Sequence, residues 1–149
     1  MIIPEIPITG TTKLTALLGS PVSHSLSPLM HNCAFRHLGL DYAYLCFDVT
    51  EKELPQAVEG LKAVGIRGFN LTMPNKNRIM DLVDHISPVS RICRSINTVV
   101  NDDGVLTGTS TDGIGYMEAL HDAGYDVTGE EITMMGGGGA STAICAQAA

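Results

Sequence analysis

Three groups of residues, two of polar side chains and one of glycines, have types and spacing that could do chemistry. In the first, "SPVSHSLSP", Ser25 and Ser27 alternate with Leu26, so in an extended segment both hydroxyls point the same way. They would lie beside the N-terminus of the helix that follows, and two hydroxyl donors at a positive helix end suit a small carboxylate. The alternative is ordinary loop chemistry, in which Ser27 is only the helix N-cap and His24 is a structural residue.

The second group of polar residues follows the ends of predicted strands. "FNLTMPNKN" places Asn70 and Thr72 in a strand and Lys76 just after it, where a lysine is either a solvated surface charge or a proton-transfer group. Asn97 lies in the apolar stretch "INTVVN", and a polar side chain there needs partners when it is buried. A polyhydroxylated ligand would provide them. Asp112 begins the next predicted helix and could join this group or act only as an N-cap.

The third stretch is the glycine run in "MMGGGGAS". Gly136, Gly138 and Gly139 are predicted between a strand and a helix, where missing side chains let backbone N–H groups approach a pyrophosphate. Ser141 takes the place of the third glycine or alanine of the common dinucleotide-binding fingerprint, and the absence of a following Gly-Lys-Ser/Thr excludes a P-loop. A tight turn without any ligand would explain the same glycines.

The elements that must position these groups are predicted from apolar patterning and from glycine and proline boundaries. Strands are predicted at 14–20, 42–49, 66–72, 96–101, 105–110 and 131–135, and helices at 27–38, 53–64, 88–93, 112–123 and 142–149. This alternation is typical of an α/β fold with a mostly parallel sheet, in which ligands bind at strand ends. The turn "NDDG" should join the fourth and fifth strands as a hairpin.

Two of these elements carry more specific predictions. Met30, Ala34 and Leu38 recur every four residues and should form the inward face of the first helix. The strand at 42–49 is apolar on both faces, which predicts a central position in the sheet.

Composition narrows the class of protein. The chain has 149 residues, of which 44% are hydrophobic and 17% charged, as in a packed globular protein. A net charge of -7, with scattered lysines and arginines, argues against a nucleic-acid partner. We also expect no membrane segment and a cytoplasmic location, because there is neither a signal-like start nor a long apolar run. Cys33, Cys46, Cys93 and Cys145 lack C-x-x-C spacing and are expected to be reduced core thiols without a metal.

A domain boundary is predicted near residues 108–130. Residues 1–110 should form one α/β domain, and residues 111–149 a linking helix followed by the first strand, glycine loop and helix of a second domain. A strand, a turn and a ten-residue helix cannot bury a sheet alone, so we expect the sequence to end inside its second domain.

Five motifs together resemble one known family. "GSPVSHSLSP", "FNLTMPNK", "SINTVVNDDG", "TDGIGY" and "GGGGAS" occur in the order and spacing of the shikimate dehydrogenases, most closely their quinate/shikimate dehydrogenase branch. The resemblance runs from about Leu17 to the last residue. It implies an α/β substrate domain, a Rossmann-type cofactor domain and an active site between them. The implied reaction is reversible hydride transfer between NADP or NAD and the C3 carbon of 3-dehydroshikimate or shikimate, in aromatic amino-acid (chorismate) biosynthesis or quinate metabolism.

The resemblance also implies roles for individual residues. Ser25 and Ser27 would bind the substrate carboxylate. Thr72, Asn97 and Asp112 would hold ring hydroxyls, and Lys76 would contact the substrate and form the catalytic pair with Asp112. The implied cofactor contacts are Gly136, Gly137, Gly138, Gly139 and Ala140. The implied partners are shikimate, 3-dehydroshikimate, quinate and a second copy in a homodimer.

Two positions depart from the family pattern. The family usually has asparagine where this chain has Ser110, and glycine or another small residue where it has Arg94. The Arg94 guanidinium could face solvent, or could reshape the pocket and change which acid is accepted. Residues that would choose NAD or NADP are expected beyond residue 149. Two other hypotheses remain: a module that binds the cyclic acid without a cofactor, and a relative that acts on an amino-shikimate ring.

Overall fold

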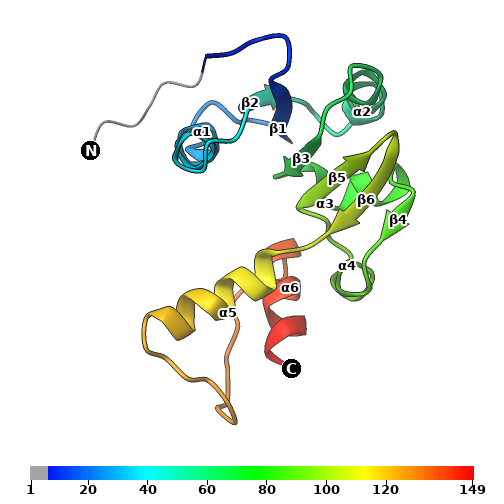
Figure 1. Ribbon diagram of the computed structural model, residues 1–149. Helices are drawn as coiled ribbons and strands as arrows, with labels where there is room; N and C mark the ends of the chain where they lie inside the picture. Colours follow the sequence, from blue (N-terminus) through cyan, green and yellow to red (C-terminus); the bar gives the residue numbers. More distant parts are fainter. Residues whose placement is uncertain (1–6) are drawn as a thin grey trace.

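The protein, described by a computed structural model over residues 7–149, is built on one six-stranded sheet (Figure 1). The strands are β1 (Lys13–Gly19), β2 (Tyr42–Asp48), β3 (Gly68–Leu71), β4 (His85–Ile86), β5 (Thr98–Asp102) and β6 (Val105–Thr109). The helices are α1 (Ser27–His37), α2 (Leu54–Ala63), α3 (Asn75–Arg78), α4 (Pro88–Cys93), α5 (Asp112–Asp122) and α6 (Gly139–Ala148), and a 3₁₀ turn, η1, covers Ile79–Asp81.

The sheet has the strand order β2-β1-β3-β5-β6-β4. β1 runs parallel to β2 and β3, and β4 runs parallel to β6. β5 is antiparallel to both β3 and β6, and its pairing with β6 is the predicted hairpin. The predicted α/β fold with a mostly parallel sheet is therefore confirmed.

The main core lies on the sheet face that α2 covers. Leu18, Leu54, Ile66, Ile96 and Leu106 are among its fully buried members, and η1 adds Ile79. Alternation along β1 places Leu17 on the opposite face, in a smaller cluster with Val22 and Tyr44 under α1. α1 and α2 therefore cover opposite faces of the sheet (Figure 1).

The prediction that the strand at 42–49 is central was wrong, because β2 is an edge strand. One face is covered, since Tyr44 packs under α1. The other is covered only in part, because Phe47 packs against the main core but Leu45 is 50% exposed. The outward backbone of Tyr44 is also paired: its N–H donates to Asn32 Oδ1, and Asn32 Nδ2 donates to its carbonyl, both at 2.9 Å. The packing of Tyr44 and Phe47 on opposite faces, rather than a second neighbouring strand, explains part of the apolar character of β2.

The same asparagine explains a second wrong prediction. α1 faces the sheet with His31, Asn32 and Phe35, whereas Met30 and Leu38 are more than half exposed and Ala34 is exposed. Asn32 must point at the backbone of β2 to make its two hydrogen bonds, so the helix is rotated away from the stripe that apolarity alone predicts.

Residues 111–149 contain two helices that pack on each other below the sheet (Figure 1). At their crossing a Cβ on Gly113 would lie 2.3 Å from the Ala143 carbonyl oxygen, so a side chain there would separate the helices. The predicted strand at 131–135 is wrong: the segment is irregular, and no strand within residues 7–149 pairs with it. Without a neighbouring strand its backbone has no ladder to join, and Met135 is 92% exposed.

All four cysteines are free, but only some are buried. Cys93 is buried and Cys46 half-buried, whereas Cys33 and Cys145 are exposed, so the prediction of core thiols was wrong for the latter two. Within residues 7–149, no helix is both long and apolar enough to cross a membrane.

Candidate active site

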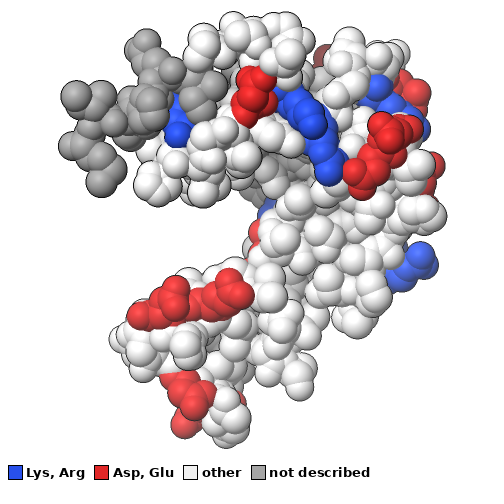
Figure 2. All heavy atoms as spheres, in the orientation of Figure 1, with Lys and Arg blue, Asp and Glu red and all other residues white. Residues whose placement is uncertain are grey.

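A cleft of about 650 Å³ opens where the loop before α1, the end of β3 and the starts of β5 and α5 meet. All six residues predicted to bind substrate line it: Ser25, Ser27, Thr72, Lys76, Asn97 and Asp112. The space-filling view shows a deep notch between the sheet and α5 (Figure 2). Residues up to 87 positions apart in the chain therefore share one cavity.

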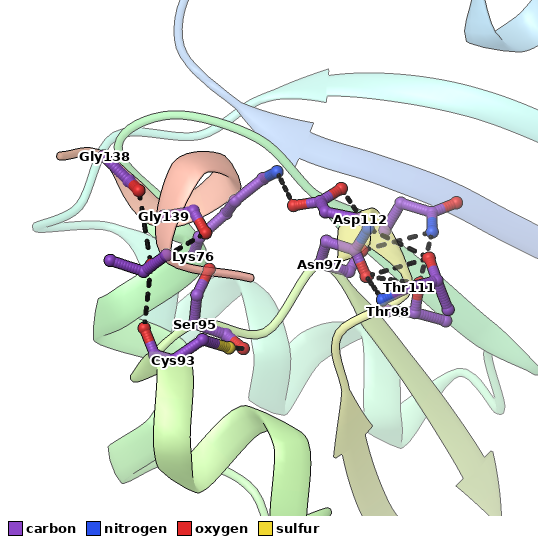
Figure 3. Close-up of polar contacts among 11 residues, drawn as sticks. Lys76, Cys93, Ser95, Asn97, Thr98, Thr111, Asp112, Gly138 and Gly139 are labelled. Carbon is purple, nitrogen blue, oxygen red and sulfur yellow. Dashed lines mark hydrogen bonds and ion pairs between the residues drawn. The ribbon is translucent and has the colours of Figure 1, made fainter. Parts of the chain in front are cut away.

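The strongest contact in the cleft joins Lys76 to Asp112 (Figure 3). Lys76 Nζ donates to Asp112 Oδ2 at 2.6 Å, and each side chain is only 20% exposed. The interpretation of Lys76 as a solvated surface charge is therefore wrong. Asp112 is not a helix cap either, because the N-cap of α5 is Thr111 and the carboxylate is directed to the lysine.

Three hydrogen bonds around Lys76 fix the geometry of the ion pair. Asn75, fully buried at the start of α3, donates through Nδ2 to the Val49 carbonyl at 2.8 Å. The Lys76 carbonyl accepts the N–H of Ile96 at 2.9 Å, which ties α3 to the segment that carries Asn97. Asn97 completes the arrangement, since its Nδ2 donates to Asp112 Oδ1 at 2.6 Å. Both carboxylate oxygens of Asp112 are thus engaged, one by a cation and one by an amide.

The serine loop lies on the other side of the cleft. Ser25 Oγ accepts the N–H of Ser27 at 3.2 Å, and α1 begins at Ser27 with Leu26 as its N-cap. The prediction that Ser27 itself caps the helix is therefore wrong. A hydroxyl that accepts a backbone N–H keeps its own proton to donate, so Ser25 remains a donor at a positive helix end that has no acidic residue in its first turn. His24 also lines the cleft and is exposed.

Gly19 sets the distance between the two sides. A Cβ at this position would lie 2.2 Å from Thr72 Cγ2 and 2.9 Å from the Met73 carbonyl oxygen. The chain that leads to the serine loop therefore packs directly on the turn that carries Thr72. The N–H of Ser20 donates to the Met73 carbonyl at 2.9 Å and fixes this approach.

The glycine loop lies beside Lys76 and Ser95 (Figure 3). Thr142, in the first turn of α6, donates through Oγ1 to the Cys93 carbonyl at 3.2 Å. A Cβ on Gly139 would lie 2.7 Å from Ser95 Oγ and 3.9 Å from Lys76 Cδ. The structure thus brings the predicted glycine loop next to the predicted catalytic lysine.

The two departures from the family pattern lie outside the cleft. Arg94 is exposed and does not line it, so of the two alternatives its guanidinium faces solvent. Its backbone is left-handed, with φ of 52°, which explains why glycine suits this position. Ser110 is buried and its Oγ has no hydrogen-bond partner within the described residues.

Sequence reasoning missed two residues around this site. His31 lines the cleft, stacks on the Tyr44 ring at 4.2 Å, and has its pKa lowered by partial burial. Tyr44 donates through its hydroxyl to Asn70 Oδ1 at 2.8 Å, and burial raises the pKa of that hydroxyl above its ordinary value. No local sequence pattern points to either residue. His31 reaches the site because of the way α1 is rotated on the sheet, and Tyr44 because of the register of β2.

Comparison with known proteins agrees with this geometry. Residues 17–99 match the family described as the shikimate dehydrogenase substrate binding domain. A shikimate dehydrogenase (NADP(+)) of Listeria monocytogenes serotype 4b is 56% identical over 142 residues, which cover 95% of this chain and 49% of that protein. The chain therefore spans about half the length of the curated relatives it matches.

Solved structures extend the likeness to three dimensions. A crystal structure of shikimate 5-dehydrogenase from Listeria monocytogenes, in complex with shikimate and NAD, has a TM-score of 0.92 at 54% identity and covers 97% of this chain and 50% of that one. The 5-ketofructose reductase of a Gluconobacter strain has a TM-score of 0.87 at 31% identity, over 94% of this chain and 50% of its own. Since the matched residues 17–99 make up more than half of its length, the chain belongs to the shikimate dehydrogenase substrate-binding domain family.

Proposed function

We propose that this chain provides the substrate-binding part of an NAD(P)-dependent dehydrogenase that interconverts 3-dehydroshikimate and shikimate. The observation that carries the proposal is the Lys76–Asp112 ion pair, held by Asn97 at one side of a cleft whose other side presents two serines. Further support comes from the Listeria monocytogenes crystal structure, which contains shikimate and NAD. In this proposal residues 1–110 are the substrate domain, and residues 111–149 are the linking helix and the opening of a Rossmann-type cofactor domain.

The serine side of the cleft would hold the carboxylate of the substrate. Ser25 and Ser27 both line the cleft, beside the positive end of α1. Hydrogen bonds to a charged group are worth about 1.5–3 kcal/mol each. With the acid fixed there, Thr72, Asn97 and Asp112 on the opposite side would meet the ring hydroxyls.

The lysine side would carry the proton. A nicotinamide dinucleotide supplies or accepts the hydride in this class of reaction. When the ketone is reduced its oxygen gains negative charge and needs a proton, which Lys76 Nζ is placed to donate; in the reverse direction Lys76 accepts it. Asp112 orients the lysine through Oδ2, while the Asn97 amide keeps Oδ1 occupied. Asp112 therefore holds the ammonium in place, and in this proposal it would also contact the reacting hydroxyl.

The residues of the glycine loop fit a dinucleotide pyrophosphate. The first helical hydrogen bond of α6 runs from the Thr142 N–H to the Gly138 carbonyl, which leaves the N–H groups of residues 139–141 free of that pattern. The first turn has no acidic residue, and open space surrounds the Cβ positions of Gly137 and Gly138. Gly136 has φ of 108°, which only glycine adopts readily. The residues that would hold the pyrophosphate are Gly136, Gly137, Gly138, Gly139 and Ala140.

Quinate is an alternative substrate, because the cleft could bind its carboxylate and ring hydroxyls with the same groups. The free cysteines are compatible with the cytoplasm, where we place the reaction. A homodimer stays a prediction.

Calorimetric titration tests acid binding by this chain. We expect weak binding of shikimate or quinate, and a roughly tenfold or greater increase in Kd for Ser25→Ala or Ser27→Ala, which lose a hydrogen bond to a charged group. Ser23→Ala is the matched control, because Ser23 is exposed in the same loop and does not line the cleft. Unchanged affinity in both serine variants would exclude the carboxylate role. In a titration with NADP and NAD we expect no appreciable affinity from residues 136–149 alone; tight binding of either cofactor would exclude the alternative of a module without a cofactor.

Turnover can be tested by joining residues 1–149 to the complementary half of the Listeria monocytogenes relative. We expect Lys76→Ala to lower kcat by about 100- to 10,000-fold, the range for a lost general acid, while shikimate still binds. The control is Lys52→Ala, at an exposed lysine outside the cleft. Near-normal turnover in Lys76→Ala would overturn the catalytic assignment.

A further inference from the structure

A continuous chain of hydrogen bonds leads from the buried Tyr44 to Asn97. The Tyr44 hydroxyl donates to Asn70 Oδ1 at 2.8 Å. Asn70 Nδ2 donates to Thr98 Oγ1 at 3.0 Å and to the Asn97 carbonyl at 3.2 Å. Thr98 Oγ1 then donates to Asn97 Oδ1 at 3.0 Å. Tyr44 is 2% exposed, so this chain starts in the core of the sheet and ends at the cleft.

The direction of each hydrogen bond follows from the one before it. In the structure the Tyr44 hydroxyl donates to the carbonyl oxygen of the Asn70 amide, and burial raises the pKa of that hydroxyl, so it keeps the proton that this hydrogen bond needs. The NH₂ side of Asn70 must then face Thr98. Because the Thr98 oxygen accepts this bond, its proton is free to point at Asn97 Oδ1.

The last step reaches the ion pair (Figure 3). With its carbonyl oxygen held by Thr98, the Asn97 amide must turn its NH₂ towards Asp112 Oδ1, at 2.6 Å. A flipped amide would set the Asn97 carbonyl oxygen against the Asp112 carboxylate, which is repulsive. The remaining oxygen, Asp112 Oδ2, is then directed to Lys76.

We propose that Tyr44 and Thr98 are positioning residues for the Lys76–Asp112 pair, with the Tyr44 hydroxyl acting through Asn70 and Thr98 to fix the side of the Asn97 amide that faces Asp112. Neither residue needs to touch the substrate for this role. The catalytic meaning of the inference rests on the proposed function, whereas the orientation of the amide does not.

Thr111 limits the size of the effect. Its backbone N–H and its Oγ1 also donate to Asn97 Oδ1, at 3.0 and 3.2 Å, so this oxygen keeps two contacts when Tyr44 or Thr98 is changed. Losing a neutral hydrogen bond changes a free energy by about 0.5–1.5 kcal/mol. We therefore expect an affinity change of about three- to tenfold rather than complete loss.

The first test follows the Asn97 side-chain amide by NMR in the ligand-free 149-residue chain. In Tyr44→Phe we expect its two NH₂ proton signals to move together and to exchange faster with water, and the Lys76 ammonium signal to broaden. Tyr42→Phe is the matched control, because Tyr42 lies on the same strand but its hydroxyl is not part of the chain of hydrogen bonds. Unchanged Asn97 signals in Tyr44→Phe would overturn the proposal, even if that variant is less stable.

The second test is a double-mutant cycle on the Kd for shikimate. Tyr44→Phe and Thr98→Val should each raise it about three- to tenfold, Thr98→Ser should restore it, and the double variant should be no weaker than Thr98→Val alone. Effects that multiply would show two independent packing roles and would also overturn the proposal. If the unmodified chain does not bind shikimate, the proposed function fails, and the NMR result still decides whether Tyr44 orients Asn97.

Discussion

The sheet of residues 7–110 and the segment of residues 111–149 differ sharply in how much apolar surface they bury. Of the buried apolar side chains among the described residues, Ala143 is the single one that follows residue 110; the others lie between Ala16 and Leu106. In the second region Tyr125 and Met135 remain mostly exposed. The first region has a buried apolar core, whereas the second is held mainly by α6, which packs on α5 and on α4.

This difference locates the two halves of the candidate site. The groups proposed to bind the acid come from loops anchored on the buried core, whereas Asp112 and the glycine loop come from the loosely packed region. A side chain is held in position best where its backbone belongs to a stable part of the fold. Lys76 and Asn97 are anchored on the sheet region, and Asp112 is held against them by its two hydrogen bonds.

Truncating a core residue should separate the two regions most clearly. Leu18→Ala removes a fully buried side chain from the main core and should lower the free energy of unfolding by about 2–5 kcal/mol. Met135→Ala, at a side chain that is 92% exposed, should change it by less than about 0.5 kcal/mol. Urea unfolding followed by circular dichroism measures both. Similar losses in the two variants would contradict the contrast.

The helix contact can be broken on its own. In Gly113→Ala the new methyl group would meet the Ala143 carbonyl oxygen, so α5 and α6 should separate at a cost of about 1–3 kcal/mol. Native-state hydrogen exchange should then speed up tenfold or more in α6 but not in β1. The control is Gly115→Ala, where nothing lies within 4 Å and the helix should gain about 0.5–1 kcal/mol. Faster exchange throughout the sheet would show that the two regions unfold together.

A substitution at the junction between the two regions should increase the free energy of unfolding. Arg94 holds a left-handed conformation directly after Cys93, whose carbonyl accepts the Thr142 hydroxyl. Arg94→Gly removes a conformational cost of about 1–2 kcal/mol, which the greater freedom of unfolded glycine partly offsets, for a net gain of about 0.5–1 kcal/mol. Arg94→Ala keeps the conformational cost of the left-handed backbone and should change the free energy of unfolding little. Comparing the two variants therefore separates the effect of the backbone from the effect of losing the guanidinium. Equal stability of the two variants in thermal unfolding would remove this explanation.

The smallest expected effect is on the pH dependence of the free energy of unfolding, and it comes from a residue of the sheet region. Partial burial lowers the pKa of His31 below its ordinary value of 6.5, so the unfolded chain takes up a proton at a higher pH than the folded one. Its contribution to stability is complete above pH 6.5 and is lost as pH falls through the lowered pKa. His31→Gln should show a shallower loss of stability in that window, measured by urea unfolding at several pH values. An unchanged slope would exclude His31 as a source.

Local patterning was sufficient to predict most elements. The six residues predicted to bind substrate were identified by the resemblance of five motifs to one family, since the local pattern around each of them also allowed an ordinary structural role. Local patterning failed where an element is placed by a distant partner. Asn32 rotates α1 by bonding to the backbone of Tyr44, and nothing in the helix itself indicates this. The segment 131–135 has the composition of a strand but no strand beside it. Tyr44 joins the site only through the pairing of β1 with its neighbours, which also brings Asn70 close.

Gly19 has a practical consequence for redesigning the cleft. A mutagenesis campaign aimed at larger acids would ordinarily vary the side chains that face the ligand. The separation between the serine loop and Thr72 is instead set behind them, where the absence of one carbon atom allows β1 to meet the turn after β3. Alanine at position 19 would act as a spacer, widening the opening while leaving every ligand-facing group chemically intact.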